Sequence, residues 1–401
     1  MQYHCLRHTR YRALPFLLAL LISACGASVA SAPAAESTPQ LFALPTVTPV
    51  PGAPAAQVPA APIVGDAQPA LLLPVPPTDT RSAALAEYVQ GRANAGAFQG
   101  AVLVAQDGRV LLSKGYGVAD TDLPATPQTR YRLASLTKQF TAAAILLLQQ
   151  QGRLKVQDPV CTYITPCPPA WQPITIHQLL SHTSGLPNYT DFFDFEATEG
   201  QVTTPQALLA RFRDLPLSFA PGTLYSYGNS GYCVLGLIIE RVSGQPYAEF
   251  MRDAIFAPLG MQDTGVDTGV GAVSAGVAPG YGAVGQRSGF LDASTLFASG
   301  NLYSSAEDLA RWDAALRDDR LLNVVSRQQM QTPNLFEYGY GVKVQQFDER
   351  LMVSHPGLMT GSATFLARFP EQRVVVIVLS NSTSVDTIGM GYGLARIVFG
   401  G

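Results

Sequence analysis

Short apolar segments with strand character occur near both ends of the folded part of this chain, and a long helical stretch separates them. The candidate strands are residues 101–105, 109–112, 340–346, 362–369 and 373–379. Asp107 and Gly108 join the first two, and an Asp-Gly pair at such a position is a strong β-hairpin signal. We therefore expect one antiparallel sheet that uses both chain ends, with a closing helix at residues 385–398.

The middle of the chain, about residues 135–330, has helical periodicity interrupted by frequent Gly and Pro residues. This pattern predicts a mostly α lobe inserted into the lobe that holds the sheet. The expected fold class is therefore α/β (α+β) and two-lobed, with an antiparallel sheet flanked by helices. We place this domain at residues 80–400, and a cleft between its lobes is where a substrate is expected.

Residues 1–24 have the features of a bacterial secretion signal. Three arginines precede an apolar run at residues 13–24, no acidic residue is present, and the run is short for a membrane-spanning helix. Residues 21–26, LISACG, resemble a lipobox, in which the cysteine is lipidated and becomes the mature N-terminus. The resemblance implies a membrane anchor at Cys25. A plain signal peptide with a coincidental cysteine is the alternative.

Residues 25–79 are expected to form a tether between this anchor and the domain. Residues 26–79 hold 12 of the 30 prolines and no Lys or Arg. Such a segment buries too little apolar surface to offset the entropy of ordering it. At about 3.1 Å per residue in polyproline II form, it reaches on the order of 150 Å. We therefore expect an exported lipoprotein on the periplasmic or extracellular face of a bacterial membrane.

The overall composition excludes some function classes. Apolar residues make up 47% of the 401 residues and charged residues 14%, which suits a globular core. The formal net charge of -3 lacks the positive footprint that phosphate backbones require, so nucleic acid is not an expected partner. No Cys, His or Asp cluster indicates a metal site, and we expect neither a metal nor a cofactor. A small-molecule or peptide substrate remains.

Two cysteines in the helical region lie close together in sequence. Cys161 and Cys167 flank a short proline-containing segment, and an exported protein meets conditions in which such a pair can oxidise. The sequence leaves open whether they form a disulfide. Cys233 lies in an apolar run, where a small buried residue is the ordinary explanation.

A serine and a lysine three residues apart open a nearly apolar stretch at residues 139–151, which predicts a buried helix. At that spacing Ser135 and Lys138 share one face of the first turn. A helix N-terminus favours the negative charge that develops in acyl transfer, and burial gives the amine a reason to lose its proton. A neutral Lys138 would accept the proton of Ser135. An N-cap serine followed by a solvent-reaching lysine is the structural alternative.

Two later segments supply further polar groups. Tyr227 and Asn229 lie on a Gly-rich loop before an apolar helix, and their side chains point the same way if the loop is extended. Residues 355–357, His-Pro-Gly, follow the apolar run 351–353 at what we predict is a strand end. A glycine there lets a ligand lie close to the backbone.

Other arrangements for catalysis are weaker. His182 and Ser184 form a candidate Ser/His pair, but no Gly-x-Ser-x-Gly elbow of an α/β-hydrolase is present. His177 and His182 do not have the spacing of a zinc-protease pair. Residues 191–196 alternate phenylalanine with acidic residues, which predicts a mobile loop over the cleft that shapes substrate choice.

Together these segments resemble the superfamily of serine β-lactamases and D-alanyl-D-alanine carboxypeptidases (penicillin-binding proteins), in its class C-like branch, which also holds esterases. The matching segments are residues 135–138, 175–187, 227–229, 302–310 and 355–357. They span about residues 85–400. Each is short, but their order and context are specific to that superfamily.

The resemblance implies a catalytic role for three side chains. Ser135 is implied to form an acyl-enzyme, Lys138 to assist its activation, and Tyr227 to relay a proton to the leaving group. We expect nearby Lys138 to ease the ionisation of Tyr227. Asn229 is implied to bind the acyl side chain of the substrate or to steady Lys138.

Residues of the later segment are implied to bind the substrate. The backbone N–H groups of Leu358 and of the nucleophile are implied to form the oxyanion hole, and His355 and Gly357 to line the site. His355 stands where many relatives have a lysine that contacts the substrate carboxylate, and Pro356 removes the hydroxyl of a Thr or Ser. A largely neutral histidine attracts a carboxylate less strongly, so peptides or esters are expected to acylate the protein better than penicillin.

Two functional hypotheses follow from these residues. The first is an exported serine hydrolase that acts through acyl-Ser135 on D-alanyl peptides, esters, amides or β-lactams. The alternative is a penicillin-binding sensor lipoprotein with the same fold, which is acylated slowly without turnover. The complete set of Ser135, Lys138 and Tyr227 favours the enzyme.

Overall fold

A computed structural model describes residues 73–74, 79–268, 274, 276–283 and 285–400. The secretion signal, Cys25 and most of the predicted tether lie outside these residues. Leu73–Pro74 (β1), which we assigned to the tether, pairs in parallel with Arg109–Tyr116 (β3), so secondary structure begins before residue 80. No described helix has both the length and the apolar character needed to cross a bilayer.

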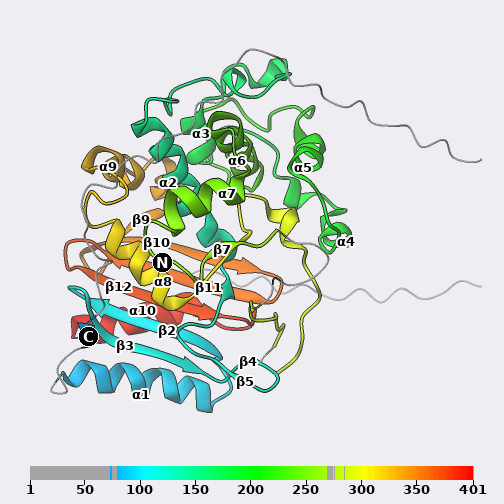
Figure 1. Cartoon of the computed structure of the whole chain (residues 1–401). Helices are drawn as coiled ribbons and strands as arrows, with labels where there is room; N and C mark the ends of the chain where they lie inside the picture. Colours follow the sequence, from blue (N-terminus) through cyan, green and yellow to red (C-terminus); the bar gives the residue numbers. More distant parts are fainter. Residues whose placement is uncertain (1–72, 75–78, 269–273, 275, 284, 401) are drawn as a thin grey trace, which may run out of the picture. The chain divides into compact units, whose positions relative to one another are not determined.

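A seven-stranded sheet forms the centre of the domain, in the order β1-β3-β2-β12-β11-β10-β9 (Figure 1). Its remaining strands are β2 Gly100–Gln106, β9 Lys343–Phe347, β10 Arg350–Met359, β11 Ser362–Phe369 and β12 Val374–Ser380. Every pairing except that of β1 with β3 is antiparallel. Because β12 lies beside β2, the sheet uses both chain ends, as predicted.

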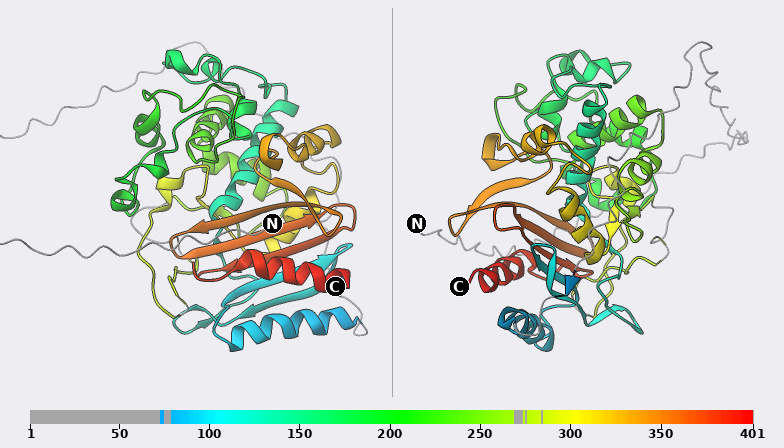
Figure 2. Two further views of the ribbon diagram at one scale, coloured as in Figure 1. Left: turned by 180° about the vertical axis from the view of Figure 1, so that it is seen from behind. Right: turned by 60° about the vertical axis from the view of Figure 1, so that its left-hand side comes forward.

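Helices cover both faces of this sheet. Thr80–Asn94 (α1) and Thr387–Phe399 (α10) lie together on one face, and the helical lobe lies on the other (Figure 2). The strand β12 shows the consequence, because all its residues are buried. Val376 packs into the cluster under α1 and α10, whereas Ile377 packs into the cluster shared with the helical lobe.

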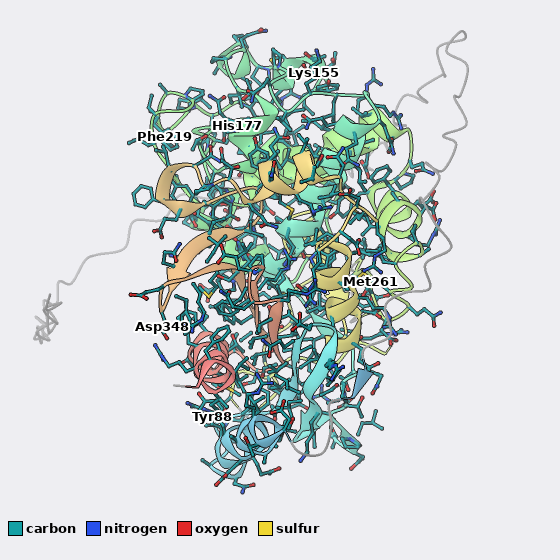
Figure 3. The ribbon with its side chains drawn as sticks, turned by 90° about the vertical axis from the view of Figure 1, so that its left-hand side faces the viewer. Tyr88, Lys155, His177, Phe219, Met261 and Asp348 are labelled. Carbon is teal, nitrogen blue, oxygen red and sulfur yellow. A yellow bond between two sulfur atoms is a disulfide. The ribbon has the colours of Figure 1, made fainter. Side chains whose placement is uncertain are left out.

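The helical lobe surrounds one almost fully buried helix, α2, Thr137–Gln150. Its other helices are α3 Ile176–Leu180, α4 Phe195–Thr198, α5 Pro205–Phe212, α6 Ser230–Ser243, α7 Tyr247–Met251 and α9 Val324–Gln331. Local signals set several ends: Thr175 forms a capping box with Gln178 at α3, and α6 ends at Gly244 with a φ of 75°. In Figure 3, Lys155 marks this lobe and Tyr88 marks α1 at the opposite end.

The predicted inserted lobe, residues 135–330, is too long at its C-terminal side. Ala306–Ala315 (α8) lies within that range but packs on β12 and β2 of the sheet. An ion pair links α8 to the sheet, since Asp313 on α8 accepts a buried 2.7 Å hydrogen bond from Arg368 on β11. The range also contains two short strands, β7 Gly265–Val266 and β8 Leu302–Ser304, which form a small sheet with β6 Tyr131–Arg132 just before the range. Outside it, β4 Val118–Asp120 pairs with β5 Leu123–Pro124.

Candidate active site

Ser135 lies in a short 3-10 helix, Ala134–Leu136, that runs directly into α2. Strand β10 packs closely against this turn at Gly357. A Cβ at Gly357 would lie 2.3 Å from the Leu133 carbonyl oxygen and 2.2 Å from Thr364 Oγ1. The absence of a side chain at Gly357 therefore allows the sheet to contact the turn that carries Ser135. From the sequence we predict that glycine at this position lets a ligand approach the backbone, whereas the structure shows that it lets β10 pack against the turn of the nucleophile.

Lys138 is fully buried in the first turn of α2, with its amine among three oxygen atoms. Its Nζ lies 3.1 Å from Ser135 Oγ, 2.8 Å from Asn229 Oδ1 and 3.0 Å from the Ser299 carbonyl oxygen. Burial holds the pKa of this amine well below its usual value of 10.5, because water no longer solvates the charged form. A neutral amine has two N–H donors and one lone pair. That set matches two fixed acceptors, from Asn229 and Ser299, and one hydroxyl.

The Tyr227 hydroxyl donates a 2.7 Å hydrogen bond to Ser135 Oγ. The side chain is 38% exposed, but its ring packs against His182, with 4.5 Å between ring centroids. A phenolate would be poorly solvated there, so burial raises the pKa of the phenol, and water on the exposed side moderates the effect. We expected the opposite direction from a charged Lys138. A buried amine that has lost its proton supplies no such charge.

Asn229 connects Lys138 to a neighbouring loop. Its Oδ1 accepts from Lys138, and its Nδ2 donates to Thr190 Oγ1 over 3.1 Å. Its backbone N–H donates to Asn188 Oδ1 over 2.8 Å. Both ends of the carboxamide are therefore used within the protein, and of the two predicted roles, steadying Lys138 is the one with a direct contact.

His355 lies inside β10, not after a strand end as we predicted, and it is 2% exposed. Its Nδ1 donates to the Pro356 carbonyl oxygen over 2.6 Å, so Nε2 is left to accept from the Tyr338 hydroxyl at 2.9 Å. Burial lowers the pKa of His355 to about 3. The ring is thus neutral and has no N–H left to donate. This arrangement does not favour the predicted contact with a substrate carboxylate.

His182 and Ser184, the weaker candidate pair, have structural contacts. His182 is 4% exposed, and its Nδ1 accepts from the Gly228 backbone N–H over 3.3 Å. Its ring supports the ring of Tyr227 from one side. Ser184 Oγ accepts from the Leu186 backbone N–H, over 3.4 Å. His182 therefore supports the Tyr227 loop, and in the described part of the chain its ring makes no hydrogen bond with a serine hydroxyl.

A groove of about 620 Å³ opens beside the nucleophile, and Asn229 and Leu358 form part of its wall. Leu358 is 68% exposed. Strand β9 pairs with β10 only as far as Ser354, so residues 355–359 have no strand neighbour on that side among the described residues. Phe195, from the aromatic segment predicted over the cleft, also lines the groove. A ligand in this groove therefore lies next to an unpaired stretch of strand.

The described residues include three cysteines, Cys161, Cys167 and Cys233. Cys161 and Cys167 form a disulfide with a Cα–Cα distance of 5.3 Å, which answers the question that the sequence left open. Cys233 is free and buried on α6. Within the described ranges, no group of three or more His, Cys, Asp or Glu residues is placed to hold a metal ion.

Three residues at the site were not singled out from the sequence: Thr190, Ser299 and Tyr338. Ser299 contributes a main-chain carbonyl, which any residue type would supply. Thr190, in a short 3-10 helix, and Tyr338 are of common polar residue types, and they reach the site only because the chain folds back there. No spacing or periodicity signal could have identified these contacts.

The Ser135 hydroxyl lies at a helix start between a sheet and a helical lobe, and it is hydrogen-bonded to a buried amine and to a phenol. This is the arrangement of a serine hydrolase. The family model described as Beta-lactamase matches residues 84–395. The chain therefore belongs to the Beta-lactamase family of serine hydrolases, and its two-lobed α/β fold is the expected one.

Individual relatives are consistent with this membership. The chain is 31% identical over 317 residues to penicillin-binding protein 4* of Bacillus subtilis (strain 168), which covers 71% of this chain and 68% of that protein. The octameric penicillin-binding protein homologue from Pyrococcus abyssi has a TM-score of 0.71 and 29% identity, over 79% of this chain and 77% of that one. A D-stereospecific amidohydrolase from Streptomyces sp. has a TM-score of 0.67 and 26% identity, over 80% of this chain and 99% of that one.

Proposed function

We propose that this protein is an exported hydrolase that acts through an acyl-Ser135 intermediate on D-alanyl peptides, esters or amides. One observation carries the proposal: Ser135 Oγ forms hydrogen bonds with both the Lys138 amine and the Tyr227 hydroxyl. A serine with one such partner is common in structural settings. With both partners it has a base that activates it and an acid that serves the leaving group.

In acylation, neutral Lys138 takes the proton of Ser135 as Oγ bonds to the substrate carbonyl carbon. The lowered pKa of the amine keeps it free to accept that proton. Negative charge then develops on the carbonyl oxygen. We assign the backbone N–H groups of Ser135 and Leu358 as its donors, at a helix start where the helix dipole also favours negative charge.

Collapse of the tetrahedral intermediate breaks the bond to the leaving group, which takes a proton from the Tyr227 hydroxyl. The raised pKa of this phenol supports a donor that is protonated at rest. The proton held by Lys138 then replaces the one lost. A water molecule next attacks the acyl carbon and gives up a proton to the same groups, and Ser135 regains its hydrogen as the acid product leaves.

The site favours peptide, ester and amide acyl donors over efficient breakdown of penicillin. His355 is neutral and keeps no free N–H, so it offers a substrate carboxylate little attraction. The name of the Streptomyces relative, a D-stereospecific amidohydrolase, supports amides among the candidates. β-Lactams remain expected acylating agents of lower efficiency.

Labelling separates this enzyme from the sensor hypothesis. We expect a fluorophosphonate and a fluorescent penicillin to modify the protein, Ser135→Ala to abolish both modifications, and intact mass to show the penicillin adduct decaying with time. At least one member of an ester, D-alanyl peptide and amide panel should turn over. A stable adduct, with no turnover of any panel member, would favour the sensor and contradict the enzyme.

We also propose that Cys25 carries a lipid anchor on the outer face of a bacterial membrane. The lipobox-like sequence supports this location, and the Cys161–Cys167 disulfide suits an oxidising compartment. The full-length protein should partition into detergent and Cys25→Ser should partition into water, with a mature N-terminal peptide that begins at Cys25 and has the added mass of acyl chains. Wild-type protein in the aqueous phase, or a mature N-terminus elsewhere, would contradict the anchor.

A further inference from the structure

The groove beside Ser135 has one charged side chain and an otherwise apolar or neutral wall. Among its described lining residues, Glu199 is the single ionisable side chain, and no Lys, Arg or His is present. The apolar part of the wall is formed by Phe195, Leu291, Leu296, Leu358 and Met359. We propose that this groove selects acyl donors that carry a protonated amine at the end of an aliphatic arm, with Glu199 as the residue that determines this specificity.

The placement of the catalytic groups indicates which part of the substrate enters the groove. Tyr227 serves the leaving group in the proposed mechanism, and neither Tyr227 nor its neighbours Tyr338 and His355 line the groove. Asn229 and Leu358 do line it, and Leu358 is the residue whose N–H we assigned to the carbonyl oxygen. The groove is therefore on the acyl side of the reacting bond. This inference deepens the proposed function and rests on it.

Contacts on both sides of Glu199 hold it in the wall. Its Oε1 accepts from Thr360 Oγ1 over 3.0 Å, and its carbonyl oxygen accepts from the Asp292 backbone N–H over 2.8 Å. One hydroxyl bond uses a fraction of the acceptor capacity of a carboxylate, so the group can also bind an ammonium. A fixed carboxylate loses less side-chain entropy on binding than a free one.

The basic residues near the groove are engaged elsewhere. Arg287, next to a lining residue in sequence, pairs with Asp120. Arg132, which donates to the Leu291 carbonyl oxygen, has a buried ion pair with Asp267. An acyl donor with a carboxylate at the far end of its arm therefore meets Glu199 without a compensating cation from the described wall, whereas an amine meets an opposite charge.

Matched esters test the proposal on the full-length enzyme. We would measure kcat/KM for 4-nitrophenyl esters whose acyl chains have equal length and end in an amine, a methyl group or a carboxylate, in a series of chain lengths. The leaving group is the same throughout, so differences report on the acyl side. A partly exposed charge pair is worth up to about 1 kcal/mol, so we expect a preference of about fivefold for amine over methyl. The carboxylate ester should be the slowest.

Variants of two nearby glutamates locate the effect. In Glu199→Gln the ratio of amine to carboxylate ester should fall to near one, because the negative charge is gone while glutamine can still accept the hydrogen bond from Thr360. Glu196→Gln, on exposed α4, should keep the wild-type ratio. In the wild type the ratio should also fall between about 0.01 and 1 M salt, as the Debye length shrinks from about 30 to 3 Å.

The outcomes distinguish this inference from the proposed function. Turnover of the methyl-ended ester that persists in Ser135→Ala would overturn the proposed function itself. Ser135-dependent turnover with no preference for the amine, or with the same preference in Glu199→Gln, would overturn the inference alone. If Glu199→Gln does not fold, the salt series decides: a wild-type ratio that does not change with salt refutes selection by a carboxylate.

Discussion

Replacing Lys138 with methionine tests the assignment of its amine as the base. Methionine keeps an apolar arm in the buried position but removes the amine that lies 3.1 Å from Ser135 Oγ. General-base catalysis contributes about 10²- to 10⁴-fold in rate. We therefore expect kcat/KM for an ester to fall about 10³-fold, which corresponds to about 4 kcal/mol of transition-state stabilisation.

The same substitution has two opposing effects on stability. Asn229 Oδ1 and the Ser299 carbonyl oxygen each lose a donor, which costs about 1–3 kcal/mol per buried acceptor. The folded state also no longer has to bury an amine, which offsets much of that cost. We expect the melting temperature of Lys138→Met to stay within about 5 °C of wild type, at about 2–4 °C per kcal/mol. A large loss of activity in a folded protein then reports on chemistry.

The pH dependence of acylation gives an independent measure of the same base. A protonated Lys138 cannot accept a proton, so kcat/KM should rise with pH through the lowered pKa of the buried amine and reach a plateau well below pH 10.5. Lys155→Met, at an exposed lysine of the helical lobe, is the matched control (Figure 3). Activity of Lys138→Met within tenfold of wild type would refute the reasoning. So would a wild-type kcat/KM that rises with pH only near pH 10.5.

Three further predictions concern other groups of the site. Tyr227→Phe should lower amide turnover by about 10²-fold or more but affect a nitrophenyl ester less, because that leaving group needs no proton; Tyr225→Phe is the control, and equal losses would contradict the role. Gly357→Ala should cost about 1–3 kcal/mol in urea unfolding through the clash with the nucleophile's turn, whereas Gly91→Ala has open space and should be neutral or stabilising; an unchanged midpoint for Gly357→Ala would exclude the clash. His355 takes up a proton near pH 6.5 in the unfolded chain and near pH 3 in the folded protein, so the free energy of unfolding should rise with pH between these values by about 1.4 kcal/mol per pH unit. In His355→Gln the melting temperature should depend less on pH over this range, and an unchanged pH dependence would contradict the assignment.

Local sequence signals predicted most of the secondary structure that frames the site. The expected hairpin at residues 101–112 is present as β2 and β3, and both turn residues, Asp107 and Gly108, have the positive φ that this pair accommodates. The closing helix expected at residues 385–398 is α10. These elements were predictable because period, turn chemistry and helix ends depend on residues a few positions apart.

Predictions that depended on distant neighbours were less successful. Whether a stretch packs on the sheet or in the helical lobe is decided by long-range contacts, such as the pair of Asp313 with Arg368 that links α8 to the sheet. The protonation of Tyr227 and the tautomer of His355 likewise depend on which groups surround them. A residue type alone does not fix its solvation or its hydrogen-bond partners.

The sequence by itself determined that Ser135 and Lys138 lie one turn apart where a buried helix begins, because a spacing of three residues places two side chains on the same face of a helical segment. Only the tertiary structure decided what meets them there. Tyr227 and Asn229 approach from 92 and 91 residues away, and the carbonyl oxygen of Ser299 from 161 residues away. Such contacts exist only after the long connecting segments have packed, and the same packing removes the water whose absence shifts the pKa values of the amine and the phenol.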